Sequence, residues 1–537
     1  MKATLKPLAI ASAVAAVTAG YSGVTQAQAT LANNSLGDLG IIPYYTVADN
    51  FVTGVHIINT DSANTQVVKL RLRRASDSMD ALDFNIILSP NDEWTGFIDD
   101  ASGNVVFATD DNSCTAPLLP NGRAEMPGLF REGATEGYIE VIGMGSVPST
   151  QPMAVGALHG ADGVPLNCQA VESNFFRNAT LPGNGNPALK GVLSASLTHQ
   201  TCTDDVFARL PSTGFGQTCA STSTSVIPNN FVETGNVLKV SFFHRDAQSG
   251  LEFGNSAVHL QNFSDVPMMT NQEIISSDDF DNYGYLFPDL NGGPPLDTPR
   301  DRFSFVRGAL GATAVVNDWS VAAARNVSTD WVVTLPGQYT MLALPQYIES
   351  LFDADVDCLT REEAAKLPNP PDAQTNINEN WCDARDLPVD LFLAGRVFDR
   401  EEQTFTNPDS GLVISPQVGN APGQDVLENE VTVIQWTDGS IEPVLPSQYA
   451  KKYDVSALDA ENGWAALSVA PSSSKTQGIY DFALSAAAGG DPRFDSIVNI
   501  APPIVGFVAW ERSFPSDPSA NYGRIVEHSY EQGSSAP

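Results

Sequence analysis

Acidic side chains at alternate positions are the residues of this 537-residue chain best suited to binding an ion. Ca²⁺ is a hard cation that needs several oxygen atoms converging from a short loop. Two stretches supply the candidate calcium ligands: Asp353, Asp355 and Asp357 in one, and Asp279 and Asp281 in the other. In the first stretch Cys358 stands where an EF-hand turn requires Gly, and Ala364 stands at the twelfth position. Asp110-Asp111-Asn112 is a third candidate, and no cofactor other than calcium is expected.

Cysteine is the second residue type with chemistry to consider. The six are Cys114, Cys168, Cys202, Cys219, Cys358 and Cys382, with no C-x-x-C motif and no His at zinc spacing nearby. In an oxidising compartment an even number indicates disulfides more than metal. Short loops favour Cys202–Cys219 and Cys358–Cys382, which leaves Cys114–Cys168 by elimination.

Catalytic motifs are missing from the sequence. There is no G-x-S-x-G and no H-E-x-x-H, and the carboxylates are too numerous to nominate a glycosidase pair. His244 and His259 flank one predicted hairpin but are spaced too far apart to share a metal, so we interpret them as strand histidines with satisfied hydrogen bonds. No catalytic residue is predicted.

The first 29 residues have the pattern of a secretory signal peptide. Lys2 and Lys6 form a charged region, Leu8–Ala19 is apolar but too short to span a bilayer, and Ala27-Gln28-Ala29 fits a cleavage site. We therefore expect a secreted protein that is extracellular or on the cell surface, with the periplasm as the alternative. No later apolar run is long enough for a membrane helix, so no membrane span is expected.

The charge balance narrows the choice of partners. The chain has 63 acidic and 28 basic residues, a net charge of −35, which becomes −37 once Lys2 and Lys6 are removed. Nucleic acid and anionic lipid surfaces need a positive footprint and are excluded as partners. One stretch of this acidic chain is basic. We call it the basic stripe, and it consists of Lys69, Arg71, Arg73 and Arg74. If the intervening Val68, Leu70 and Leu72 face a core, the stripe faces solvent, where it either protects a strand edge or docks an acidic neighbour such as a second copy.

These residues must be positioned mainly by strands. Alternation of apolar and polar residues has the period of a half-buried antiparallel strand. The predicted strands are 55–59, 68–73, 84–89 and 94–98, read as a meander, then 237–244, 257–263, 430–436, 464–469 and 504–510. Thr298 and Pro299 mark the start of one helix near 299–316.

The predicted fold class is mainly β, with two or three antiparallel β-sandwich-like domains and few short helices. Turn-rich stretches suggest the boundaries: signal peptide 1–29, N-terminal β-sandwich 30–150, central β-rich region 151–345, and C-terminal β-rich region with a polar tail 346–537.

Several short motifs carry a resemblance. They are Ile42-Pro43-Tyr44-Tyr45-Thr46-Val47, Ile58-Asn59-Thr60, Leu88-Ser89-Pro90-Asn91-Asp92-Glu93-Trp94, Thr329-Asp330-Trp331 and Ala520-Asn521-Tyr522-Gly523. With these the chain resembles a family of uncharacterised secreted proteins of proteobacteria. The resemblance implies a shared exported β fold and adds no catalytic residue.

Together these features predict an exported, acidic, β-rich protein that acts by interaction at the cell surface or in the extracellular matrix, without catalysis. Its partner would be a surface or matrix component or a second copy. The alternative is a secreted hydrolase acting on polysaccharide or ester substrates. A deep pocket lined by a His or by two close carboxylates would favour the hydrolase, and exposed strand edges would favour interaction.

Overall fold

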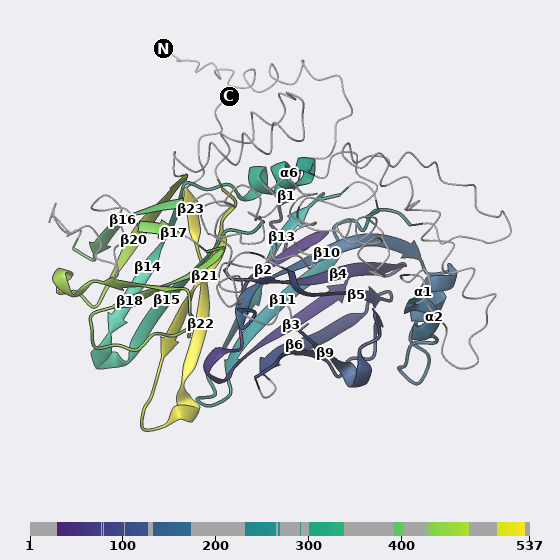
Figure 1. The fold of residues 1–537 in the computed structure, drawn as a ribbon, viewed down its shortest axis with the longest axis horizontal. Helices are drawn as coiled ribbons and strands as arrows, with labels where there is room; N and C mark the ends of the chain where they lie inside the picture. The colour runs from purple at the N-terminus through teal and green to yellow at the C-terminus, as the bar shows by residue number, and fades with distance from the viewer. Residues whose placement is uncertain are drawn as a thin grey trace, which may run out of the picture.

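The computed structural model describes two β-sandwiches that lie side by side (Figure 1). The described residues are 29–76, 78, 80–100, 103–126, 133–172, 175, 231–264, 267–268, 290, 300–337, 391–401, 425–427, 429–471 and 502–531. Strands dominate them, and nearly all strand pairs are antiparallel. The predicted fold class is confirmed.

The first sandwich consists of a seven-stranded and a six-stranded sheet. The seven-stranded sheet contains, in spatial order, β1 (Thr30–Leu31), β13 (Val258–Gln261), β2 (Leu39–Thr46), β10 (Glu136–Pro148), β4 (Asn64–Arg74), β5 (Asp80–Leu88) and β8 (Cys114–Ala116). The six-stranded sheet contains β12 (Glu252–Ser256), β11 (Leu238–Asp246), β3 (Phe51–Asn59), β6 (Glu93–Asp100), β7 (Val105–Ala108) and β9 (Arg123–Glu125).

The predicted strands exist, but their predicted arrangement as a meander is wrong. Strand β3 pairs with β6 and β11 in one sheet, whereas β4 pairs with β5 and β10 in the other. The turns at 60–63 and 89–92 therefore carry the chain from one sheet to the other. This crossing lets Leu70 and Leu72 of β4 join Ile57 of β3 and Trp94 of β6 in one core, because each sheet buries its apolar face against the other.

The second sandwich is one ten-stranded sheet folded over on itself. Its strands are β17 (Asp425–Leu427), β16 (Leu391–Asp399), β20 (Asn462–Pro471), β14 (Ala314–Ala322), β15 (Val327–Thr334), β18 (Val431–Thr437), β19 (Ala450–Asp454), β21 (Val505–Arg512), β22 (Tyr522–Glu527) and β23 (Ser529–Glu531). Strands β14 and β15 pair only next to their connection. The two halves then face each other across a core that contains Trp319, Trp331 and Trp436.

Helices in the described part of the chain are few and short. They are α1 (Pro152–Ala157), α2 (Cys168–Glu172) and α6 (Arg300–Leu310), and the single 3₁₀ turns are Ala48–Asn50, Pro120–Gly122, Ala323–Arg325, Ser456–Leu458 and Pro518–Ala520. The helix predicted near 299–316 is α6, which ends earlier because β14 begins at Ala314. No helix in the described ranges is long and apolar enough to cross a membrane.

The central region drawn from the sequence is divided between the two sandwiches. Strands β11–β13 complete the first, whereas β14 and β15 belong to the second. The predicted boundary at 345 lies outside the described residues. The sandwiches also share one apolar cluster, in which Val332, Val433 and Phe507 of the second pack with residues of the first.

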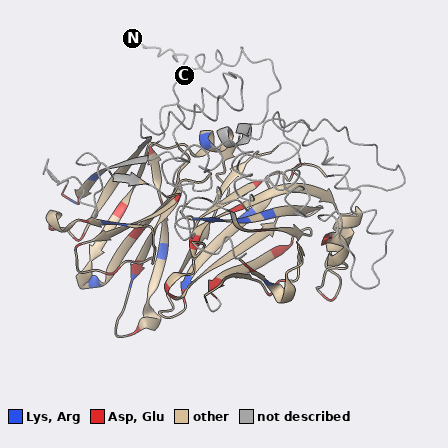
Figure 2. Ribbon diagram, viewed as in Figure 1, with Lys and Arg blue, Asp and Glu red and all other residues tan. Residues whose placement is uncertain are grey.

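The basic stripe is buried, so the prediction that it faces solvent is wrong. Lys69, Arg71, Arg73 and Arg74 are each at most 7% exposed, and Figure 2 shows basic residues within the first sandwich. Strand β4 lies inside its sheet between β10 and β5, and both of its faces are covered. Lys69 forms an ion pair with Asp83, and Arg73 donates from Nε and Nη2 to the two oxygens of Glu140 at 3.1 and 3.3 Å. Buried cations are stabilised by such pairing, which alternation alone does not reveal.

Candidate binding site

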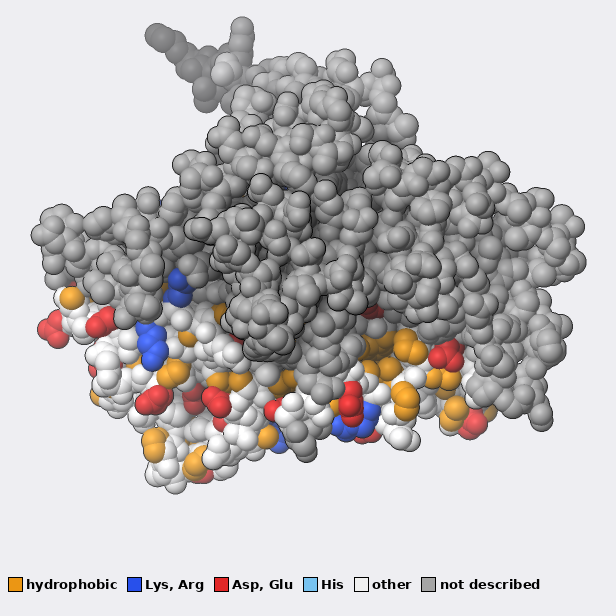
Figure 3. Space-filling model, viewed as in Figure 1, with side chains coloured by type: hydrophobic (Ala, Val, Ile, Leu, Met, Phe, Trp, Pro, Cys, Tyr) orange, Lys and Arg blue, Asp and Glu red, His pale blue; other side chains and the backbone are white. Residues whose placement is uncertain are grey.

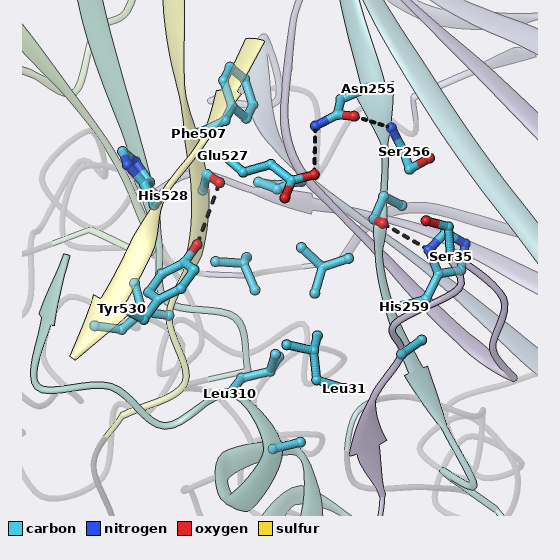
Figure 4. Close-up of a pocket in the computed structure, with 18 of the residues that line it drawn as sticks. Leu31, Ser35, Asn255, Ser256, His259, Leu310, Phe507, Glu527, His528 and Tyr530 are labelled. Carbon is cyan, nitrogen blue, oxygen red and sulfur yellow. Dashed lines mark hydrogen bonds between the residues drawn. The ribbon is translucent and has the colours of Figure 1, made fainter. Parts of the chain in front are cut away.

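A pocket of about 420 Å³ lies where the two sandwiches and α6 meet (Figure 4). The first sandwich contributes β1 and the corner between β12 and β13. The second contributes the start of β21 and the strands β22 and β23. Since ligand sites are often concave and lie between domains, this pocket is the candidate functional site.

His259 lines the pocket, but it holds the corner between β12 and β13. The backbone N–H of Val240 donates to Nε2 at 2.8 Å, and Nδ1–H donates to the carbonyl of Ala257 at 2.8 Å. These partners set the tautomer and use both ring nitrogens. Burial is the main cause that lowers the pKa of His259 to about 4. The hydrogen bond to the Ala257 carbonyl opposes this effect, and the charge of Lys239 adds to it. The ring is therefore neutral at pH 7 and is a satisfied strand histidine, as predicted.

His528 lies on the opposite side of the pocket, and both of its ring nitrogens are also hydrogen-bonded to protein groups. Its Nε2 donates to the carbonyl of Val332 at 3.0 Å, and its Nδ1 accepts from the side-chain amide of Asn317 at 3.1 Å. Burial lowers its pKa to about 4. Neighbouring Gly506 must lack a side chain, because a Cβ there would lie 2.0 Å from the carbonyl oxygen of Val332. His528 therefore has no nitrogen left to act as a base.

The remaining polar groups at the rim of the pocket are uncharged, except for the carboxylate of Glu527. Asn255 of β12 donates to Glu527 of β22 at 3.3 Å, which links the two sandwiches across the mouth. Tyr530 donates to the carbonyl of Gly506 at a long 3.5 Å, and burial, with Glu527 adding to it, raises the pKa of its hydroxyl. Figure 4 shows Glu527 and Tyr530 on one wall and Ser256 and His259 on the other. These groups can orient a ligand, but no nucleophile is hydrogen-bonded to a base among them.

A second constellation, Ser89, Asp92 and His159, combines the residue types of a serine hydrolase. The Ser89 hydroxyl lies 3.2 Å from His159 Nδ1, but Asp92 approaches that same nitrogen at 3.7 Å. The other nitrogen, Nε2, contacts the side-chain oxygen of Asn112 at 2.8 Å. A triad instead places the acid and the serine on opposite nitrogens. Ser89 is also buried and donates to Asp92 at 3.2 Å, so the group closes a turn.

The calcium candidates are tested only in part. Asp353, Asp355, Asp357, Asp279 and Asp281 lie outside the described residues, so calcium binding there stays a prediction. In the third candidate, Asp111 accepts from the backbone N–H of Ser113 at 2.8 Å and from its hydroxyl at 2.7 Å, as a turn-capping aspartate does. Within the described ranges, no group of three or more His, Cys, Asp or Glu is placed to hold a metal.

The predicted disulfide Cys114–Cys168 is present and is confirmed. It ties β8 to α2 beside a separate apolar cluster that includes Met144, Met153 and Val171. The other predicted pairs, Cys202–Cys219 and Cys358–Cys382, lie outside the described residues.

Sequence reasoning did not nominate the polar residues of the pocket other than His259. Asn255 and Glu527 are separated by 272 positions and belong to no motif. The only local sign was the pair of prolines before β21, Pro502 and Pro503, which places an irregular segment next to the pocket. No family model, curated protein or solved structure matches this chain.

Proposed function

We propose that this chain is an exported, non-catalytic binding protein of the cell surface or extracellular matrix, and that the pocket between its sandwiches is where it binds. The observation that carries the proposal is the state of the two pocket histidines. Both are neutral and both have their ring nitrogens committed to protein groups, so the pocket offers shape and hydrogen bonds without an acid–base pair. The resemblance to exported proteobacterial proteins and the predicted signal peptide support the compartment.

The composition of the surface agrees with this role. In Figure 3 the described part of one face mixes acidic, uncharged and apolar side chains, with few basic ones. A chain of net charge −35 repels other polyanions and favours neutral or cationic partners.

Binding in the pocket can be tested with Nile red, an uncharged fluorophore whose emission changes in an apolar site. The purified exported protein is expected to bind it saturably with one site per chain. Ser256→Phe, a change at a half-buried position of the edge strand β12, should fill the pocket mouth and abolish binding. Gln248→Phe on the exposed turn of the same hairpin is the matched control and should bind normally. Equal binding by all three proteins would show that the pocket is not the site.

The hydrolase alternative has its own test, since Ser89, His159 and Asp92 combine the residue types of a serine hydrolase without its geometry. The protein should not turn over p-nitrophenyl butyrate above the uncatalysed rate. Turnover that disappears in His159→Ala would establish the hydrolase instead. Fractionation of a native culture into medium, surface and membrane would test the compartment separately.

A further inference from the structure

The pocket has an apolar interior. Leu310 of α6, Ile504, Val505 and Phe507 line it and are buried, at most 7% exposed. Leu31 of β1 also lines it but is 55% exposed. A ligand that entered the pocket would remove part of the Leu31 side chain from water, which favours binding of an apolar body.

The charge of the described lining comes from one residue. Among the described residues that line the pocket, Glu527 is the only carboxylate and none is Lys or Arg. His259 and His528 are neutral, since burial lowers both pKa values to about 4. Lys239 acts on His259 from β11 but is not a lining residue. The described lining therefore offers a ligand one negative charge and no positive charge.

Glu527 also keeps capacity for a ligand. The amide of Asn255 uses one of its oxygens, at 3.3 Å, whereas a carboxylate has about four acceptor positions. Tyr530 stands near Glu527 on the same wall, and Phe507 lies close to it in Figure 4. An aromatic ring whose face lies over an ammonium group adds a cation–π contribution to charge pairing.

From this arrangement we infer that the pocket takes an amphipathic amine: a small molecule with an apolar body seated against Leu310 and Phe507 and an ammonium head group paired with Glu527. This inference rests on the proposed binding function and adds the chemical class of the ligand. The volume of about 420 Å³ lies within the range of small-molecule sites, so the body can be aliphatic or a small aromatic ring system. Anionic analogues of the same shape are rejected by the Glu527 charge.

The test compares three probes of equal chain length, hexylamine, 1-hexanol and hexanoate, by calorimetric titration at pH 7. Glu527 is exposed, and an exposed ion pair contributes up to about 1 kcal/mol, so hexylamine should bind about two- to fivefold more tightly than 1-hexanol, and hexanoate should bind most weakly. Glu527→Gln should abolish the preference for the amine over the alcohol. Glu252→Gln on exposed β12, outside the pocket, makes the same change in net charge and should leave the preference intact.

The outcomes separate this inference from the proposed function. Equal affinity for amine and alcohol, both lost in Ser256→Phe, would overturn the amine assignment and leave a neutral binding pocket. The amine assignment would also be overturned if the preference for the amine survived Glu527→Gln or fell equally in Glu252→Gln. Either result would show a general attraction of amines to an acidic surface. If none of the probes binds while Nile red does, the ligand class is wrong and the pocket stands. If Nile red also fails, the proposed function is wrong.

Discussion

Glu136 of the first sandwich accepts a hydrogen bond from the backbone N–H of Gln448 in the second, at 2.7 Å. Its other oxygen accepts from the hydroxyl of Tyr44 at 2.9 Å, and that hydroxyl oxygen lies 3.0 Å from the carbonyl oxygen of Pro446. From the other side, Asp330 accepts from the backbone N–H groups of Val444 and Leu445. Two buried carboxyl groups, one from each sandwich, therefore hold the segment 444–448 between them.

Removing the Glu136 carboxyl should weaken the contact between the sandwiches. Glu136→Leu removes a hydrogen-bond partner of the buried Tyr44 hydroxyl and the acceptor of the Gln448 N–H, which should cost about 2 kcal/mol in the free energy of unfolding. Glu136→Gln retains one acceptor oxygen and should lose less. Denaturant titration followed by tryptophan fluorescence measures both. A Leu variant as stable as the Gln variant would contradict the role of this contact.

Asp330 should make stability depend on pH. Burial, with smaller opposing effects from two N–H donors, raises its pKa to about 7 from the usual 3.8. Between these values the folded state holds more protons than the unfolded state, so the contribution of Asp330 to stability is present below pH 4 and is lost as pH rises to about 7. The stability of the wild type relative to Asp330→Asn should therefore fall over this range, by on the order of 4 kcal/mol.

The comparison with Asp330→Asn isolates this group. His244, His259 and His528 have pKa values lowered by burial and act in the opposite direction, because their contribution is lost as pH falls below about 6.5. Asp110→Asn, on an exposed turn, should track the wild type across the range. A pH-independent difference between the wild type and Asp330→Asn would rule out this assignment.

The buried pair of Arg73 and Glu140 can be tested by breaking it and then replacing it. Arg73→Met leaves Glu140 in the interior without its bidentate partner and should destabilise the protein by about 3–5 kcal/mol. The double variant Arg73→Met/Glu140→Leu should recover part of that loss, since both charges of this pair are then removed. If Arg73→Met changes the unfolding midpoint no more than an exposed substitution does, the stripe is not buried as described.

Two buried histidines should respond differently to replacement by Phe. His259→Phe removes the acceptor of the Val240 N–H and should cost about 1–3 kcal/mol. His244 lies among Tyr44, Phe242, Phe253 and Phe507, and its Nε2 has no hydrogen-bond partner among the described residues. His244→Phe loses the buried hydrogen bond between Nδ1 and Thr53 at 3.1 Å, but the Thr53 hydroxyl keeps its bonds to Thr46 and the unpartnered Nε2 is removed. This change should therefore alter stability by less than about 1 kcal/mol. Thermal melts of both variants measure this difference, and equal losses of stability would contradict the prediction.

The Cys114–Cys168 disulfide closes a loop with a sequence separation of 54. On the chain-entropy model, Cys114→Ala/Cys168→Ala should lose about 4 kcal/mol of stability. Limited proteolysis should then cut first around α1 and α2, which the bond ties to β8. Substitution is preferable to a reducing agent, because a reductant would act on all six cysteines. Unchanged stability and cleavage would show that packing alone holds this region.

The sequence by itself determined the local structure. Alternation in Val68, Leu70 and Leu72 predicts a strand because side chains on a strand alternate between its faces, and that strand is β4. The start of α6 and the Cys114–Cys168 bond were likewise readable from residue types and loop lengths. The strand and the helix start depend on residues that are neighbours in sequence. The disulfide follows because it is the pair that remains once the two short-loop pairings are assigned.

Only the tertiary structure decided which strands pair and what covers each face. The polar face of β4 reads as a solvent face, yet Glu140 of β10 and Asp83 of β5 neutralise Arg73 and Lys69 in the interior. The pocket likewise joins Leu31, His259 and Glu527 from distant parts of the chain. Strand period specifies where a side chain points but not which sheet will face it, because pairing energies differ little among similar strands and packing of the whole core selects among them.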